Sequence, residues 1–333
     1  MTANNKPTIF SGIKATGKMH VGNYLGAIKN WVNLQNSGQH NTIYSIVDLH
    51  SITIDIGREE LLSNTLDMAT DLLAAGIDPK KSIFFVQSHV KEHTELGWIF
   101  NCILPVGELE KMTQYKDKSR QHKDNVNMGL FDYPALMAAD ILLYHATAVP
   151  VGDDQDQHVE LARKVVRKFN NRWGEYFQEP QSLLARTPRL MALNDPAKKM
   201  SKDLGPKSYI AMSDSPAEIQ DKISRAVTDT GGGKNAVGGK NLIDLFEAFV
   251  DDENITAKFK EDYKNGELQY AKFKPMLANV IIGALKPIQE KRKELEKNPD
   301  YVMRVLKTGA EAAREIAQKT MREVRERVGL ISQ

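Results

Sequence analysis

A short apolar run, a glycine-containing turn and an amphipathic helical pattern follow one another at the start of the chain. Residues 8–10 have the character of a buried strand, Gly12 and Gly17 punctuate the turn, and apolar residues recur at helical spacing across 21–32. The first turn of a helix leaves backbone N–H groups unpaired and carries partial positive charge, which favours a phosphate. The stretch alone fits a phosphate site and an ordinary first βα unit equally well.

Three residues at the start of that helical pattern suit a phosphate. Gly22 lets a phosphate come close to the backbone, and His20 and Asn23 lie about one turn apart. Their side chains can donate hydrogen bonds to charge that moves over a phosphate during a reaction. We therefore treat this turn as a candidate for catalysis on a nucleotide.

Strand and helix patterns continue to alternate beyond the first helix. Residues 42–47 and 82–87 have strand character, and a helical pattern covers 59–75 between them. This order predicts a parallel sheet with right-handed crossovers, whose ligands lie at the carboxyl ends of the strands. The residues expected at that edge are Gly12, His50 and Gln87.

The remaining chain is mostly helical in pattern. Residues 146–152 predict one more strand, and 190–206 predict a loop between breakers. Helical patterns follow at 216–227, 242–249 and 280–296. The last helix, over 311–328, carries Ala312, Ile316 and Met321 among many charges, which predicts a partly exposed face.

Composition excludes several classes of protein. The chain has 333 residues, 41% hydrophobic and 26% charged, with a net charge of +2, so it has room for two domains but no global basic field. A single cysteine excludes an intramolecular disulfide and suits a reducing, cytoplasmic compartment. Cys102 lies in an apolar run, which predicts a buried thiol. The sequence shows neither a signal peptide nor the ~18 apolar residues that a membrane span needs.

A loop near residue 200 carries a cluster of lysines. Lys198, Lys199 and Lys202 lie between breakers. Such clusters are often plain solvated surface, but lysines on a mobile loop can also close over a pyrophosphate that leaves a triphosphate. Lys118, in a second basic loop, can reach the same phosphates or serve as ordinary surface charge.

One aspartate lies in the otherwise apolar helical stretch 133–144. A buried carboxylate without a partner costs several kcal/mol, so Asp140 must be paired, act as a cap or bind a ligand. Tyr133, Met137 and Asp140 fall at i, i+4 and i+7 and share one face. A phenol, a thioether and a carboxylate suit a flat aromatic ligand with one N–H donor. Pairing of Asp140 with a neighbouring chain segment is the alternative.

Polar residues follow the predicted strand at 146–152. Gly152 permits a turn, and Asp153 or Asp154 can cap the next helix. Gln155, on the first turn, can hold the ammonium or carboxylate of a small ligand. Asp154 and His158 lie one turn apart, but capping explains the acids and no third ligand stands out, so we predict no metal site.

Together these motifs resemble the bacterial and mitochondrial tryptophanyl-tRNA synthetases, a class I aminoacyl-tRNA synthetase family, along essentially the whole chain. Residues 20–23 match the family's variant of the HIGH signature, and 199–203 match KMSKS except at the last position. Residues 152–155 resemble the family's GEDQ motif. Asp140 occupies the position at which the family recognises the indole N–H of tryptophan. Several signatures in this order and at this spacing are specific.

The resemblance implies a fold, cofactors and partners. It implies an α/β chain with a Rossmann-like doubly wound parallel sheet in a catalytic domain at 1–205, with a helical insertion at about 91–145. A helical anticodon-binding module at 206–296 and a C-terminal helix in 297–333, with room to pack back on the catalytic domain, complete it. The resemblance also implies a homodimer that binds tRNA(Trp) across both subunits, and a need for ATP with Mg²⁺ held mainly by its phosphates.

The reaction follows from the same resemblance. The carboxylate of L-tryptophan attacks the α-phosphorus of ATP to give tryptophanyl-adenylate and pyrophosphate, and the acyl group then passes to the 3′-terminal ribose of the tRNA. Positioning and charge stabilisation suffice for this chemistry, with no covalent enzyme intermediate. The resemblance assigns catalysis to His20, Asn23, Lys118, Lys199 and Lys202.

The two substrates take overlapping and separate sets of residues. The resemblance assigns ATP binding to Gly12, Ile13, Lys14, Gly17, His20, Gly22, Asn23, Gly152, Asp153, Asp154, Lys199, Met200, Ser201 and Lys202. It assigns tryptophan binding to Phe10, His50, Tyr133, Met137, Asp140, Val149, Val151 and Gln155, with Tyr133 and Gln155 on the ammonium.

Three positions depart from the family's pattern. Lys14-Ala15 stands where the family usually has Gln-Pro, and Asp203 replaces the closing serine of KMSKS. Residues 239–241 read Gly-Lys-Asn instead of Val-Ser-Asn. The first two departures place new charges beside phosphates, so they can alter the affinity for ATP.

Three other functions compete with this interpretation. A tyrosyl-tRNA synthetase shares the fold and both signatures. Asp140 can accept a hydrogen bond from a phenol as well as from an indole, but the resemblance of the surrounding residues favours tryptophan. A small-molecule nucleotidylyltransferase uses a similar glycine loop but leaves the lysine loop and the helical module without a role. A non-catalytic RNA-binding paralogue fits Lys14 and Asp203, whereas intact His20, Lys199 and Lys202 oppose it.

Overall fold

The structure is a computed structural model in which the chain divides into two compact units. It describes residues 6–116, 126–152, 156–184, 190–228, 237–250 and 252–331. Unit 1 comprises Met1–Gly17, Trp31–Ala185 and Asn298–Gln333, and unit 2 comprises Lys18–Asn30 and Arg186–Lys297. These units reflect packing, whereas the predicted domains at 1–205, 206–296 and 297–333 assign functions, so the domain assignments stay predictions.

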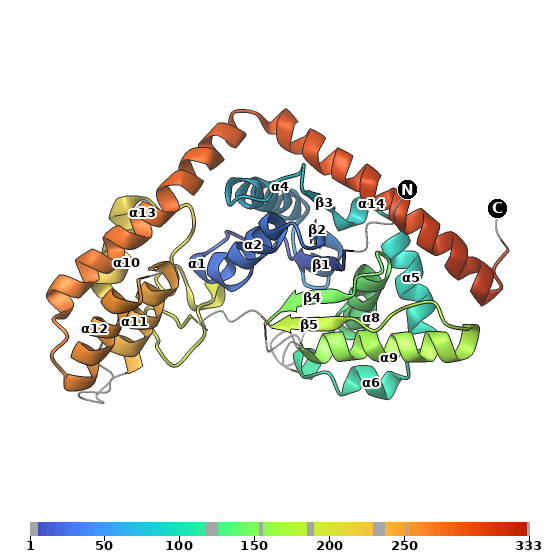
Figure 1. Cartoon of the computed structure of the whole chain (residues 1–333), viewed down its shortest axis with the longest axis horizontal. Coiled ribbons are helices and arrows are strands. Elements are labelled where there is room, and N and C mark those ends of the chain that lie inside the picture. The colour runs from blue at the N-terminus through green and yellow to red at the C-terminus, as the bar shows by residue number, and fades with distance from the viewer. Residues whose placement is uncertain are drawn as a thin grey trace. The chain divides into compact units, whose positions relative to one another are not determined.

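Unit 1 is built on a parallel sheet (Figure 1). The described strands lie in the order β3-β2-β1-β4-β5, and every pair is parallel. The predicted α/β class with a doubly wound parallel sheet is therefore confirmed. The strand order reverses direction between β1 and β4, and ligands of such sheets bind outside the strand ends at this reversal. The strands are β1 (Thr8–Ile13), β2 (Asn41–Ile46), β3 (Ser82–Val86), β4 (Ala148–Val151) and β5 (Gln181–Leu184).

Helices connect and cover these strands. The apolar faces of α5, α8 and α9 join the strands in one continuous core that includes Phe85, Phe100 and Phe169. Burial of these faces is the main stabilisation that holds the strand ends in place. The helices of this part are α2 (Lys29–Ser37), α3 (Asp48–Ser51), α4 (Arg58–Ala74), α5 (Glu92–Asn101), α6 (Val106–Glu110), α8 (Met128–Leu142) and α9 (Asp156–Trp173).

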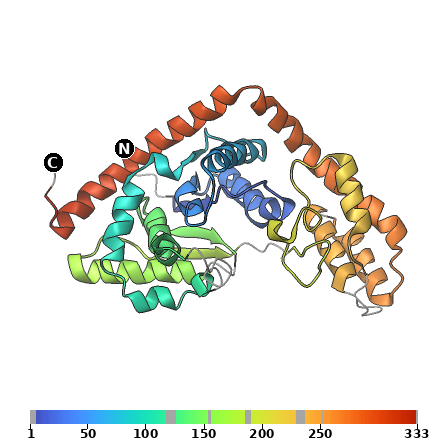
Figure 2. The ribbon, with the colours of Figure 1, turned by 180° about the vertical axis from the view of Figure 1, so that it is seen from behind.

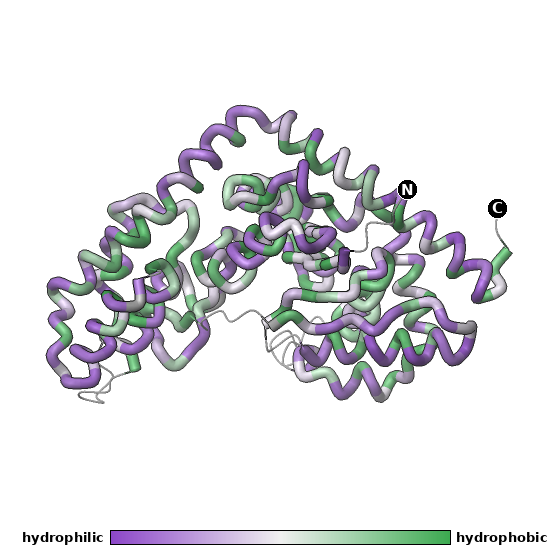
Figure 3. The backbone as a smooth tube through the Cα atoms, viewed as in Figure 1, coloured by the Kyte–Doolittle hydropathy of each residue, from purple (hydrophilic) through white to green (hydrophobic). Residues whose placement is uncertain are grey.

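The long helix α14 (Pro299–Val328) lies along the edge strand β3 and along α5, as both views of the ribbon show (Figures 1 and 2). A Cβ at Gly309 would overlap the backbone carbonyl of Phe84, so only glycine permits this approach. Hydrophobic and hydrophilic turns alternate along α14 (Figure 3). Ala312 and Ile316 are half-buried, as the predicted partly exposed face requires, whereas Met321 is buried in the core together with Ala313 and Ala317.

Unit 2 is helical apart from its loops. The described helices include α10 (Pro216–Arg225), α11 (Val237–Phe249), α12 (Glu253–Asn265) and α13 (Tyr270–Glu296). The helices predicted at 216–227, 242–249 and 280–296 correspond to α10, α11 and α13 and are confirmed. Helix α13 begins ten residues earlier than predicted. Apolar residues of α10, α11 and α13, among them Ile223, Phe246 and Phe273, are buried.

Three details differ from the sequence predictions. Gly12 lies inside β1 and not in the turn, and a Cβ there would come within 2.6 Å of Val47, so this glycine serves strand packing. Cys102 is exposed at the C-terminal end of α5, so the predicted buried thiol was wrong. Strand β5 was not predicted, because its four residues lack a clear alternating pattern. No helix within the described ranges is long and apolar enough to span a membrane.

Candidate active site

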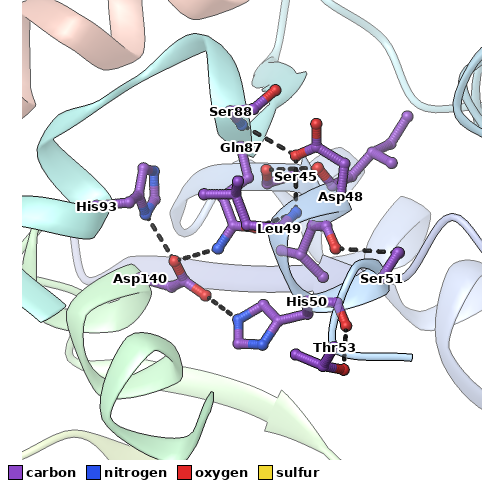
Figure 4. Close-up of polar contacts among 12 residues, drawn as sticks. Ser45, Asp48, Leu49, His50, Ser51, Thr53, Gln87, Ser88, His93 and Asp140 are labelled. Atoms are coloured by element: carbon purple, nitrogen blue, oxygen red, sulfur yellow. Dashed lines mark hydrogen bonds and ion pairs between the residues drawn. The ribbon is translucent and has the colours of Figure 1, made fainter. Parts of the chain in front are cut away.

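A buried carboxylate lies where three segments of unit 1 converge. Asp140, on α8, is 1% exposed. Its Oδ2 lies 2.8 Å from Nε2 of His50, and its Oδ1 lies 2.6 Å from both Nε2 of Gln87 and Nδ1 of His93. Figure 4 shows the three side chains directed at the carboxylate from separate elements. The expectation that His50 and Gln87 meet at the strand ends is therefore confirmed.

The hydrogen bonds keep this carboxylate ionised. Burial alone would raise the pKa of Asp140, but the hydrogen bonds from His50 and His93 outweigh it and hold the pKa below its usual range. An ionised carboxylate only accepts hydrogen bonds. The group is therefore built to receive a donor.

The apolar and aromatic residues assigned to tryptophan lie on the sheet and on α8. Phe10 lies on β1, and Val149 and Val151 lie on β4, so these residues stand on the two strands at the reversal of the strand order. All three are buried. Met137 is half-buried on α8, one turn before Asp140.

The phenol of Tyr133 has two neighbours that the sequence did not predict. Its oxygen lies 2.9 Å from Nε2 of the buried His158, and the ammonium of Lys14 lies 5.5 Å from the centroid of its ring. Burial raises the pKa of Tyr133, so the phenol stays protonated. When the hydroxyl donates to His158, its oxygen lone pair can accept from an ammonium.

In unit 2, His20 caps the short helix α1 (Val21–Asn23), which continues as a π-helical turn at Tyr24–Ile28. The N–H of Gly22 donates to Nδ1 of His20 at 3.1 Å, and the N–H of His20 donates to Oδ1 of Asn23 at 3.2 Å. The first backbone N–H groups were expected to be unpaired, and this expectation was wrong. Besides the Gly22 bond, Val21 donates to the carbonyl of Ile210, and Asn23 donates to the carbonyl of His20.

The predicted lysine loop lies beside His20 within unit 2. Burial, and then the positive charges of Lys202 and Lys199, lower the pKa of His20 to about 4. The ring is therefore neutral at pH 7, and because Nδ1 accepts from Gly22, its hydrogen lies on Nε2. His20 thus presents one neutral N–H donor in a cationic setting.

Backbone contacts hold this arrangement. Lys199 forms an isolated antiparallel bridge with Met191, and His20 forms one with Ala211. Ser208 donates to the carbonyl of Ser201 at 2.6 Å. Lys198 of the same loop forms an ion pair with Asp195 at 2.9 Å.

Gly22→Ala is expected to slow adenylate formation by about 10²-fold, because His20 would lose its position as a donor. A Cβ at residue 22 would lie 2.8 Å from Nδ1 and Cε1 of the His20 ring. Single-turnover formation of adenylate measures the effect. Gly26→Ala is the matched control, since a Cβ there meets no heavy atom within 4 Å. Equal rates for the parent and Gly22→Ala would contradict this account.

Comparisons with known proteins agree on one family. The family model for class I tRNA synthetases (W and Y) matches residues 2–286. The chain belongs to this family. A tryptophan–tRNA ligase of Wolinella succinogenes is 46% identical over 334 residues, which cover 98% of this chain and 99% of that protein.

Solved structures of the class I tRNA synthetases support the same assignment. The tryptophanyl-tRNA synthetase of Campylobacter jejuni, in complex with ADP and tryptophan, matches with a TM-score of 0.83 and 36% identity over 97% of this chain and 100% of that one. The Mycoplasma pneumoniae tryptophanyl-tRNA synthetase matches with a TM-score of 0.86 and 32% identity, covering 98% and 99% of the two chains.

Other predicted site residues of this class I synthetase lie at strand ends and turns of unit 1. Gly12 and Ile13 end β1, Gly17 has a positive φ of 58° in the following turn, and Gly152 follows β4. Lys118, Asp153, Asp154 and Gln155 lie outside the described residues, as does the side chain of Asp203.

Sequence reasoning missed His93, Tyr144 and His158 in this class I synthetase. His93, Leu96 and Phe100 share helical spacing on α5, which marks His93 as facing the core, and Tyr144 lies four residues after Asp140. These signals were available, but they do not reveal which carboxylate or phenol each residue contacts.

Proposed function

We propose that this class I synthetase is a tryptophan–tRNA ligase. It activates L-tryptophan with ATP to give tryptophanyl-adenylate and pyrophosphate, and it then transfers tryptophan to tRNA(Trp). The observation that carries the proposal is the buried, ionised Asp140, because its carboxylate can accept the indole N–H. The naming of the Wolinella and Campylobacter relatives supports the same substrate.

Unit 1 provides the side chains assigned to tryptophan. Asp140 accepts the indole N–H, and Phe10, His50, Met137, Val149 and Val151 shape the surroundings of the ring. Tyr133 accepts from the ammonium through its phenol oxygen, which is compatible with its bond to His158. Gln155 is assigned to the same ammonium.

Unit 2 provides most of the side chains assigned to the phosphates. His20, through Nε2–H, and the amide of Asn23 stabilise charge on the α-phosphoryl group as the carboxylate attacks. Lys199, Lys202 and Lys118 are assigned to the departing pyrophosphate. The positive charge that lowers the pKa of His20 supports this placement of the lysines. The remaining contacts to ATP are assigned to Gly12, Ile13, Lys14, Gly17, Gly22, Gly152, Asp153, Asp154, Met200 and Ser201.

The nucleotide brings Mg²⁺ with it. Mg²⁺ keeps several waters and prefers phosphate oxygens, so the proposal places it on the ATP phosphates. Among the described side chains, no three His, Cys, Asp or Glu residues gather as metal ligands. When bound, Mg²⁺ neutralises phosphate charge during the transfer. Activation without Mg²⁺ at the parent's rate would contradict this part.

The proposal includes a homodimer in the cytoplasm, where tRNA charging serves translation. Trp98 on α5 and Val106 on α6 are 70% and 61% exposed, an unusual exposure that a second copy would relieve. Sedimentation equilibrium should give the mass of two chains. A single-chain mass at micromolar concentration would oppose the dimer.

The decisive experiment is ATP–pyrophosphate exchange with each of the twenty amino acids, followed by charging of tRNA(Trp). We expect exchange with tryptophan alone. Exchange with tyrosine instead would assign the chain to the tyrosine branch of the family. An absence of exchange with every amino acid, in the presence of Mg²⁺ and ATP, would overturn the proposal.

A further inference from the structure

A count of hydrogen bonds shows that the two oxygens of Asp140 are used unequally. An ionised carboxylate has about four positions for donors, two on each oxygen. Within the described residues, Oδ1 receives Gln87 and His93, whereas Oδ2 receives His50 alone. One position on Oδ2 therefore remains for a ligand.

His93 fixes this asymmetry from inside the core. It is fully buried on α5, so it can act on a ligand only through Asp140. Its Nδ1 donates to Oδ1 of Asp140 at 2.6 Å, and its Nε2 lies 2.7 Å from the hydroxyl of Tyr144. The rings of Phe85 and Tyr144 pack against it with centroid distances of 6.0 and 5.4 Å.

The ionised carboxylate of Asp140 sets the direction of this chain of hydrogen bonds, and Tyr144 completes it. Burial raises the pKa of the Tyr144 hydroxyl, and the charges of Asp140 and Glu92 raise it further, so the hydroxyl keeps its hydrogen. When the His93 ring carries one hydrogen, the Tyr144 hydroxyl donates to Nε2, and the ring hydrogen must lie on Nδ1, facing Asp140. Without the hydroxyl, Nε2 would lose the donor that Tyr144 provides, and the ring would be held less firmly in the orientation that directs its Nδ1–H at Oδ1.

We propose that His93, oriented by Tyr144, is a positioning residue for substrate recognition, which saturates Oδ1 of Asp140 and leaves Oδ2 to accept the indole N–H. This inference rests on the proposed function, because it needs tryptophan as the ligand of Asp140. It assigns amino-acid specificity to two side chains that do not touch the substrate. A purely structural pair would stabilise the fold without distinguishing between ligands.

Tyr144→Phe tests the proposal, since it removes only the hydroxyl. The substrates are tryptophan and 3-(3-benzothienyl)alanine, in which sulfur replaces the indole N–H. We expect the variant to raise the KM for tryptophan about 10-fold in pyrophosphate exchange, in line with a weakened buried hydrogen bond. The KM for the benzothienyl analogue should change less than 2-fold, and the kcat for tryptophan should stay within about 3-fold.

Tyr44→Phe is the matched control. Tyr44 is also fully buried in unit 1, and its hydroxyl donates to the carbonyl of Trp31 at 2.8 Å. Its loss should leave the ratio of the two KM values at the parent's level. His93→Gln carries a second test, because its amide can still donate to Asp140, so it should keep more of the preference for tryptophan than His93→Leu.

Each outcome has a distinct meaning. A parallel change in both KM values, or no change in either, would overturn the role of His93 and Tyr144. If Tyr144→Phe fails to fold by circular dichroism, the comparison of His93→Gln with His93→Leu decides instead, and equal KM ratios there would overturn it. A parent enzyme that does not activate tryptophan would refute the proposed function. A parent enzyme that activates tryptophan but does not prefer it to the analogue would overturn this inference alone.

Discussion

Asp140→Asn is expected to lower kcat/KM for tryptophan by about 10³-fold or more. Binding sites that hydrogen-bond a polar group of the substrate lose specificity constants of this order when that bond cannot form. Gln87 and His93 both donate to Oδ1, so an asparagine would keep its amide oxygen there. Its NH₂ group would then replace Oδ2 and meet the indole N–H donor to donor. The substitution keeps the shape of the side chain while it reverses the polarity at the substrate.

Pyrophosphate exchange over a range of tryptophan concentrations measures this effect. Asp132→Asn is the control, because Asp132 lies on the same helix and accepts from Asn101 at 3.0 Å, away from Asp140. We expect that variant to keep the parent's kcat/KM within a few-fold. If Asp140→Asn left the tryptophan KM and kcat unchanged, Asp140 would not be the acceptor of the indole.

Lys202→Ala is expected to slow adenylate formation by about 10²- to 10³-fold with little change in tryptophan affinity, since the lysine stabilises charge that develops only as pyrophosphate leaves. Single-turnover measurement with saturating tryptophan separates the two effects. Lys198→Ala is the matched control, because Lys198 lies in the same loop, pairs with Asp195 and is not among the charges that lower the pKa of His20. A single-turnover rate equal to that of the parent would remove Lys202 from this role.

The same variant carries a pH signature. Burial, Lys202 and Lys199, in that order, lower the pKa of His20 to about 4, so removal of Lys202 should raise that pKa toward 6.5. Protonation of His20 would then begin at a higher pH. The acid limb of the pH–rate profile for adenylate formation should move to higher pH in Lys202→Ala and keep its position in Lys198→Ala.

The alternation of strands and helices could be predicted well because it depends on local periodicity. β2, β3 and α4 lie within one or two residues of their predicted bounds. Features that depend on contacts between residues far apart in the sequence could not be predicted from local periodicity. The role of Gly12 depends on Val47, and the buried face of α14 depends on where β3 and α5 meet it.

The candidate site shows the same division. The spacing of Tyr133, Met137 and Asp140 placed them on one helical face, and the need for partners around Asp140 followed from the cost of burying a charge. The identity of those partners did not follow, since His93 and Gln87 come from segments about 50 residues away. Likewise, the sequence at 20–23 does not reveal that the His20 side chain caps its own helix, because this cap depends on side-chain geometry.

The covering of β3 by α14 has a consequence for how the protein is made. More than 200 residues separate Phe84 from Gly309, so the ribosome completes the sheet's outermost strand long before the helix that shields it exists. During that interval the nascent chain exposes a strand edge that can pair with other chains. Chaperone protection is therefore needed most between these two events, and messages truncated before α14 should yield insoluble product.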